Sequence, residues 1–197
     1  MDRLIIQQLI NEMKEFYMSA KPELMHISRA RAYIGEYEIK GAKHNPAIIA
    51  LWDAAERAAK TNIGWLFPGG KKNDEVAWCG AFVGGVFGQV GLGEKIPKEF
   101  YRASSWGKAG TKLSKPAYGC VAVLDRAGGR HVGFVVGKTK SGRIKLLGGN
   151  QSDQVNIMDF DPKRITDYRW VSTGDAPHDH RYDLPILPAG KLSTNEA

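Results

Sequence analysis

The chain is poor in cysteine and has no long apolar run. Its 197 residues include two cysteines, Cys79 and Cys120, which is too few for a disulfide framework. Neither belongs to a CxxC motif or to a cysteine–histidine spacing typical of zinc, so the pattern does not indicate a zinc site. A single disulfide between the two cysteines is possible, and it would remove Cys79 as a reactive thiol. No apolar run reaches the length of a membrane-spanning helix.

The N-terminus lacks the order of a secretory signal. Asp2 comes before any basic residue, and Gln7 and Gln8 interrupt the apolar stretch from Leu4 to Ile10. We therefore expect the protein to be made in the cytoplasm without a signal peptide. Reaching a target outside the membrane would then require help.

Acidic residues are outnumbered. The chain has 28 Lys and Arg against 21 Asp and Glu, which gives a net charge of +7. Such an excess favours polyanionic partners such as nucleic acid, anionic lipid surfaces or an acidic cell envelope. The basic residues are scattered without a dense arginine tract, which is typical of a solvated surface, so we do not expect nucleic-acid binding to be the main role. The 43% of hydrophobic residues suffice for the core of one soluble domain.

The first half of the chain predicts helices. Residues 1–20 have apolar residues every three or four positions and predict an amphipathic helix. Packing on the main domain is the simpler interpretation of this helix, and a membrane-active or partner-binding role is the alternative. A second helix is expected from near Ser28 towards Gly35. Asn45-Pro46 is typical of an N-cap followed by proline at the first helical position, and predicts a third.

A further helix is expected from Asp74, as its N-cap, to about Val90, with Cys79 in its early turns. Four glycines in this segment cost helix propensity, so we expect close backbone packing against a neighbour to offset them. They are Gly80, Gly84, Gly85 and Gly88.

After Pro116 the apolar period changes to two. This pattern predicts strands over residues 120–124, 131–136 and 143–147. Lys140-Ser141-Gly142-Arg143 is a good hairpin turn between the last two of them. The segment after Gly174 is rich in Pro, His and Asp, and we expect an irregular tail.

Cys79, His131 and Asn150 follow one another in the order of a nucleophile, a base and a group that orients the base. If Ser141 and Gly142 are the central residues of the hairpin turn, Asn150 lies opposite Gly133. Because side chains alternate along a strand, His131 would then share a sheet face with Asn150. An odd-numbered loop or a bulge would break this relation.

The position of Cys79 suits a nucleophile. The N-terminus of a helix lowers the pKa of a thiol, and its backbone N–H groups can hold an oxyanion. His131 would act as general base and acid, or as the imidazolium of an ion pair, and Asn150 would accept its N–H and fix the ring. The alternative for Cys79 is a small buried hydrophobic residue.

Tryptophans are the candidates for substrate contact. Trp78, beside the predicted nucleophile, and Trp106 could line a groove for glycan or peptide. Trp52, Trp65 and Trp170 are expected in the core.

Three other patterns are interpreted as structural. His178-Asp179-His180 resembles a metal-ligand pair but is expected to be a solvated turn. His44 is expected to be a capping or loop residue rather than a second base. Asp74 and Glu75 are adjacent and point in different directions, so they do not form a glycosidase carboxylate pair.

Several segments within residues 28–172 resemble, in the right order, the CHAP and NlpC-like cysteine peptidases of bacteria and phages. These segments are Ala30-Arg31 through Gly35-Glu36, Gly41 with His44-Asn45-Pro46, residues 74–79 (DEVAWC), residues 131–137 (HVGFVVG) and residues 147–153 (LGGNQSD). The resemblance implies an α+β papain-like fold, with N-terminal helices packed on a small antiparallel β-sheet. It also implies a triad of Cys79, His131 and Asn150 that works without metal or cofactor.

The domain organisation follows from the extent of the resemblance. We expect an amphipathic helical extension over residues 1–26, a catalytic domain over residues 27–173 and an irregular tail over residues 174–197. One departure is Gly119-Cys120, where the family usually has Gly-Asp before a strand. We expect Cys120 to be a structural residue, so the loss of that charge should affect substrate contacts more than catalysis.

The resemblance implies a monomeric hydrolase of peptidoglycan amide bonds, either an endopeptidase or an N-acetylmuramoyl-L-alanine amidase. Positive charge would aid its encounter with anionic groups of the bacterial envelope. The missing signal peptide fits a phage endolysin that reaches the wall through a holin pore, and fits a virion-borne lysin or a contact-dependent toxin equally. The alternative is a non-catalytic wall-binding or virion structural protein that retains the fold.

Overall fold

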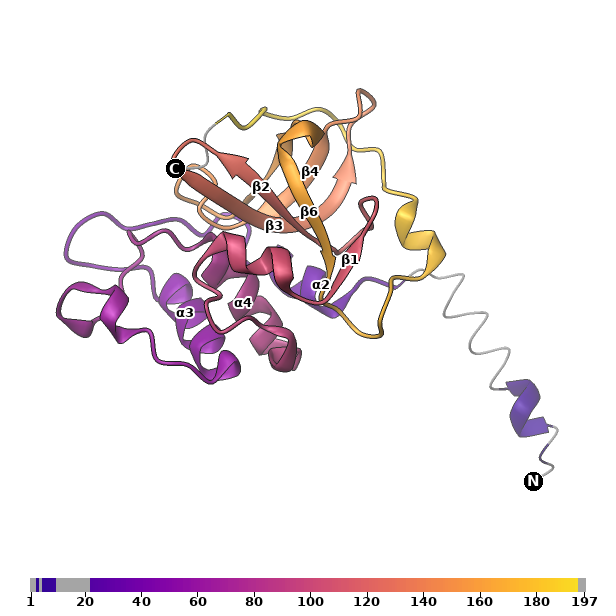
Figure 1. Ribbon diagram of the computed structural model, residues 1–197, viewed down its shortest axis with the longest axis horizontal. Coiled ribbons are helices and arrows are strands. Elements are labelled where there is room, and N and C mark those ends of the chain that lie inside the picture. Colours follow the sequence, from indigo (N-terminus) through magenta and orange to yellow (C-terminus); the bar gives the residue numbers. More distant parts are fainter. Residues whose placement is uncertain (1–2, 4, 10–21, 195–197) are drawn as a thin grey trace.

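Figure 1 shows the computed structural model, which describes residues 3, 5–9 and 22–194. The helix predicted over residues 1–20 lies mostly outside the described residues. The described chain combines helices with one antiparallel sheet, so the predicted α+β class is confirmed. None of the helices in these ranges is long and apolar enough to cross a membrane.

The sheet has six antiparallel strands in the order β1-β6-β2-β3-β4-β5. The strands predicted from the alternating pattern are present as β2, β3 and β4. The bounds are β1 Thr111–Leu113, β2 Val121–Arg126, β3 Gly129–Lys138, β4 Ile144–Gly148, β5 Asn156–Phe160 and β6 Ile165–Trp170.

Three α-helices pack on one side of this sheet (Figure 1). They are α2 Met25–Arg31, α3 Pro46–Ala59 and α4 Cys79–Gln89. Short 3-10 helices occupy Gly64–Leu66, Pro68–Gly70, Gly93–Lys95, Ala103–Lys108, Pro162–Arg164 and Asp179–Tyr182.

The starts of two helices test the predicted caps. The side chain of Asn45 accepts the N–H of Ala47 at 2.8 Å, with Pro46 as the first residue of α3, so that cap is confirmed. Asp74 is not an N-cap, because α4 begins five residues later. Its buried carboxylate instead accepts the N–H groups of Ile39 at 2.8 Å and Asn45 at 2.7 Å. Asp74 therefore ties two loops together.

The glycines of α4 allow it to lie against neighbouring backbone, as predicted. A Cβ at Gly80 would meet the carbonyl oxygen of Phe100 at 2.1 Å. One at Gly85 would meet the carbonyl oxygen of Leu51, in α3, at 2.6 Å. Any larger residue would therefore push α4 away from its neighbours, and the start of the helix is fixed by this packing.

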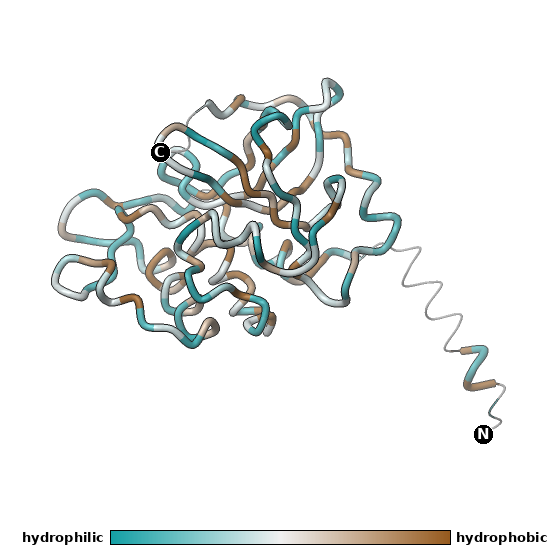
Figure 2. Tube along the Cα trace, in the orientation of Figure 1, coloured by the Kyte–Doolittle hydropathy of each residue, from teal (hydrophilic) through white to brown (hydrophobic). Residues whose placement is uncertain are grey.

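The two faces of the sheet bury separate apolar clusters. Val123, Val132 and Phe134 belong to the cluster shared with α4. Leu124 and Val135 belong to a second cluster on the opposite face. Figure 2 shows the apolar residues concentrated where helices and strands meet, with hydrophilic residues in the outer loops.

The segment after Gly174 is largely irregular and runs along the sheet. It forms isolated parallel bridges from Ile186 to Lys138 and from Leu192 to Asp159. The guanidinium of Arg181 donates to the carbonyl oxygen of Pro22 at 2.6 Å. This C-terminal strap, residues 178–193, thus joins the first described residues of the main body to the sheet.

Candidate active site

Cys79 is the first residue of α4 and opens on a cavity. Its side chain is largely buried, with 4% of the residue exposed. The cavity has a volume of about 450 Å³. Its walls come from the start of α4, the loop around Tyr101 to Ser104, and the hairpin between β2 and β3. The predicted place of Cys79 in the early turns of a helix is confirmed.

The surroundings of Cys79 act on its thiol in opposite directions. Burial raises the pKa of Cys79, and this effect exceeds the others. The charge of Arg126 and hydrogen bonds from the backbone of Val132 and Gly80 act to lower the pKa. A thiol with a raised pKa is protonated at neutral pH, so its use as a nucleophile needs a base.

The hairpin that forms one wall of the cavity is short. Arg126 and Gly129 are paired, so Ala127-Gly128 form a two-residue turn, with Gly128 at a φ of 77°. Asp125 and Arg130 are also paired, and their side chains form an ion pair of 3.0 Å. The turn therefore projects two arginines, one of which has a carboxylate partner.

His131 lies on β3 with its ring away from α4. Val132 and Phe134 face α4, and β2 and β3 are in uninterrupted register here, so alternation turns His131 to the opposite face. The ring is 1% exposed and stacks on Phe160 with centroids 5.9 Å apart. The structure thus brings the backbone of Val132 to Cys79, while the imidazole of the preceding residue lies on the other face.

Gln151 contacts His131. The Nε2 atom of His131 lies 3.1 Å from Oε1 of Gln151. The amide of Gln151 is oriented by Asn156, since its Nε2 donates to the carbonyl oxygen of Asn156 at 2.8 Å. Its Oε1 therefore accepts from Nε2–H of His131. Gln151 was not among the predicted site residues, although it directly follows Asn150 in the segment that resembles the family.

Asn150 does not pair with β3. The register of β3 and β4 matches Phe134 with Leu147, and it shifts between Val135 and Gly137. Strand β4 then ends at Gly148, and Asn150 has a φ of 56° outside the sheet. The predicted pairing of Asn150 with Gly133 is wrong, because a bulge and a five-residue loop replace the two-residue turn assumed for the hairpin.

The tryptophans are arranged differently from the prediction. Trp78 and Trp106 are 0% exposed, and their indole N–H groups donate to Glu38 and to the backbone of Phe100. Neither ring has the exposed surface that the predicted substrate contact needs. Trp65, predicted in the core, is instead 67% exposed and meets Tyr101 edge-on, with centroids 5.8 Å apart.

Trp65 is therefore an exposed tryptophan in contact with the cavity wall, because Tyr101 lines the cavity together with Cys79. Trp52 and Trp170 are buried, as predicted. Burial is a tertiary property, and no local pattern distinguished Trp65 from the other two.

The two cysteines are both free, so no bridge joins them. Cys120 is fully buried in the second cluster, and burial raises its pKa to about 12. Its expected structural role agrees with this position.

His44 contacts Asp74 through Nδ1 at 2.9 Å, in the loop region where it was predicted.

Comparison of the chain with protein-family models, with curated proteins and with solved structures finds no match. Function is therefore inferred from the residues of this chain and from the resemblance of their motifs.

Proposed function

We propose that this protein is a cysteine hydrolase that cleaves amide bonds of bacterial peptidoglycan, with Cys79 as nucleophile and His131 as base. The observation that carries the proposal is the position of the Cys79 thiol. It lies at the first residue of a helix, lines a cavity large enough for a peptide group, and receives backbone hydrogen bonds. The motif resemblance to CHAP and NlpC-like peptidases and a papain-like arrangement of helices on a sheet belong to the same proposal.

The reaction runs in two steps. The thiolate of Cys79 attacks the carbonyl carbon, a C–S bond forms, and backbone N–H groups at the start of α4 stabilise the developing oxyanion. The C–N bond then breaks, and the imidazolium returns its proton to the departing amine. Water next attacks the thioester, which yields a carboxylic acid and restores the thiol.

His131 supplies the base, and Gln151 orients its ring through Nε2. The imidazole lies against Phe160 in this conformation. Proton transfer therefore requires the start of β3 to rearrange so that the imidazole reaches the thiol. The backbone contact between Val132 and Cys79 means that this rearrangement involves residues already adjacent to the nucleophile.

Charge and aromatic surface support the proposed substrate. The net charge of +7 favours encounter with an anionic envelope. Trp65 offers an exposed ring beside the cavity, and the negative face of an indole attracts the C–H groups of a sugar. A phage endolysin released through a holin pore is the setting we propose, and a virion-borne lysin or a toxin would use the same chemistry.

The second candidate is a non-catalytic wall-binding or virion structural protein. Two observations favour it, namely the imidazole of His131 on the face away from α4 and the raised pKa of the Cys79 thiol. Such a protein would bind sacculi through the same surface without cutting them.

Digestion of purified sacculi with the wild type and with Cys79→Ala separates the two candidates. The hydrolase predicts soluble products from the wild type alone, and their masses identify the bond that is cut. Sedimentation of both folded proteins with sacculi, without products from either, would favour the binding protein and remove the enzyme assignment.

A further inference from the structure

The cavity beside Cys79 contains three arginines that differ in their partners. Arg130 pairs with Asp125 at 3.0 Å. Arg102 lies 3.7 Å from Glu99, and its guanidinium stacks 5.7 Å from the centre of the Tyr101 ring.

Arg126 is the exception. Its Nε atom is shielded from solvent and has no hydrogen-bond partner among residues 22–194. The neighbouring carboxylate, Asp125, is already engaged by Arg130. A buried donor of a charged group without a partner is costly. Because Arg126 is only partly buried and lines the cavity, an oxygen of a bound ligand could pair with its guanidinium and offset this cost.

Arg126 lies close to the proposed nucleophile. It ends β2, lines the same cavity as Cys79, and its charge acts on the Cys79 thiol. A guanidinium presents its N–H groups as a planar fork that matches a carboxylate. An anionic group held by this fork would therefore lie next to the atom that attacks the substrate.

We propose that Arg126 binds a carboxylate of the substrate beside the bond that Cys79 attacks, and selects stem peptides in which that carboxylate is free. This inference rests on the proposed function for the identity of the substrate. Arg126 is then a specificity-determining residue, and the wall of the cavity formed by residues 125–130 is an anion subsite.

The subsite can be tested without hydrolysis by comparing two alkylating reagents of similar size. Iodoacetate carries a carboxylate, whereas iodoacetamide is neutral, and peptide mass spectrometry reads the modification of Cys79 separately from that of Cys120. We expect Arg126→Gln to lower the ratio of the iodoacetate rate to the iodoacetamide rate about tenfold. Arg126→Lys keeps the positive charge but lacks the planar fork of the guanidinium. Its rate ratio should therefore lie between that of the wild type and that of Arg126→Gln.

Arg102→Gln is the matched control, because it removes the same charge from an exposed, paired arginine of the same cavity. Its rate ratio should stay near that of the wild type. An equal fall of both rates in Arg126→Gln would mean that Arg126 only stabilises the thiolate, and would overturn the proposal. An unchanged ratio would overturn it as well.

Sacculi test the same selection on the proposed substrate. We expect the wild type to release products faster from untreated sacculi than from sacculi whose carboxylates have been amidated, and Arg126→Gln to lose this preference. Equal release by the wild type from both would contradict the inference. If the wild type released nothing from either, the proposed function would fail, and the alkylation ratio would still decide whether Arg126 forms an anion subsite.

Discussion

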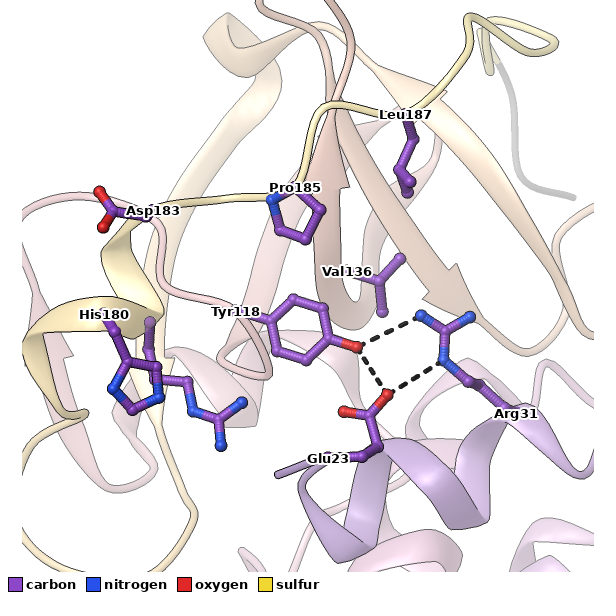
Figure 3. A pocket seen from close by; sticks show the side chains of 9 residues that line it. Glu23, Arg31, Tyr118, Val136, His180, Asp183, Pro185 and Leu187 are labelled. Carbon is purple, nitrogen blue, oxygen red and sulfur yellow. Dashed lines mark hydrogen bonds and ion pairs between the residues drawn. The ribbon is translucent and has the colours of Figure 1, made fainter. Parts of the chain in front are cut away.

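Strand β3 has a cavity at each end, and the two cavities differ in whether the arginines that line them are paired within the protein. At the hairpin end, Arg126 lines the cavity of Cys79 with its Nε unpaired among the described residues. At the other end, beside Val136, a cavity of about 360 Å³ lies under the C-terminal strap (Figure 3).

The arginines of the second cavity are paired within the protein. Tyr118 donates its O–H to Glu23 at 2.8 Å, and Arg31 donates to the Tyr118 oxygen at 3.3 Å, as Figure 3 shows. Arg181 donates to the backbone of Pro22. Charges that satisfy one another hold segments together, whereas an unsatisfied charge at a cavity wall is suited to a ligand. Substitutions beside the Cys79 cavity are therefore expected to change its chemistry, whereas substitutions beside the second cavity are expected to change the stability of the protein.

The largest effect should follow from the residue that orients His131. Gln151→Leu removes the acceptor of Nε2–H, so we expect product release from sacculi to fall about 100-fold. Asn150→Gly, which suits the φ of 56° at that position, should change release little. Urea unfolding of both variants would check that they fold. A greater loss in Asn150→Gly than in Gln151→Leu would restore Asn150 as the orienting residue.

Acid should weaken the region near the second cavity through His26. This ring is buried, its Nε2 lies 2.9 Å from the carbonyl oxygen of Gly119, and burial lowers its pKa from 6.5 to about 4. The stabilisation by neutral His26 is complete above pH 6.5 and is lost as the pH falls towards 4, by up to about 3 kcal/mol. Urea unfolding between pH 7 and pH 4 should therefore show a smaller loss in His26→Gln than in the wild type. Parallel curves for both proteins would argue against this assignment.

Tyr118→Phe should cost stability without affecting Cys79. The variant removes the hydroxyl that joins Arg31 to Glu23, and we expect the free energy of unfolding to fall by about 1 kcal/mol. The ratio of the iodoacetate and iodoacetamide rates at Cys79 should stay unchanged. A change in that ratio would show that the two ends of β3 are coupled, and the contrast between them would no longer hold.

The smallest effect is expected at the rim of the first cavity. Trp65→Ala removes an exposed ring, so stability should change by less than about 0.5 kcal/mol. Binding to sacculi, measured by sedimentation at increasing protein concentration, should weaken about two- to tenfold. Trp78→Phe, at a buried ring, is the contrasting variant, because it should lower stability and leave the affinity of the folded protein unchanged.

The features that the sequence predicted correctly are local ones. The cap of α3 by Asn45, the glycine packing of α4 and the alternation along β2 to β4 each depend on residues close together in the chain. The register beyond Val135 could not be predicted in this way. Gly137 lies where a Cβ would be 2.8 Å from Leu187 in the C-terminal strap, some fifty residues later, so the strand is shaped by a distant segment.

The candidate site was predicted in part. Cys79 was singled out because His131 and Asn150 follow it in the order of a catalytic triad, and the helical period of the residues after it indicated a helix, although the predicted start at Asp74 was five residues too early. The role of Gln151 depends on where β4 ends, and the direction of the His131 ring depends on which face of the sheet the helices cover. The exposure of Trp65 likewise depends on tertiary packing, which no pattern of neighbouring residues encodes.

The two-residue turn between β2 and β3 also offers a place where the sequence could change without disturbing the fold. Asp125 to Arg130 form one wall of the cavity, yet most of these residues are exposed and none belongs to either apolar cluster. Six consecutive codons could therefore be exchanged for those of another short hairpin while the helices, the sheet and the thiol stay in place. Grafting turns of different charge at this position would give a family of proteins that differ in the substrates they accept and share one scaffold.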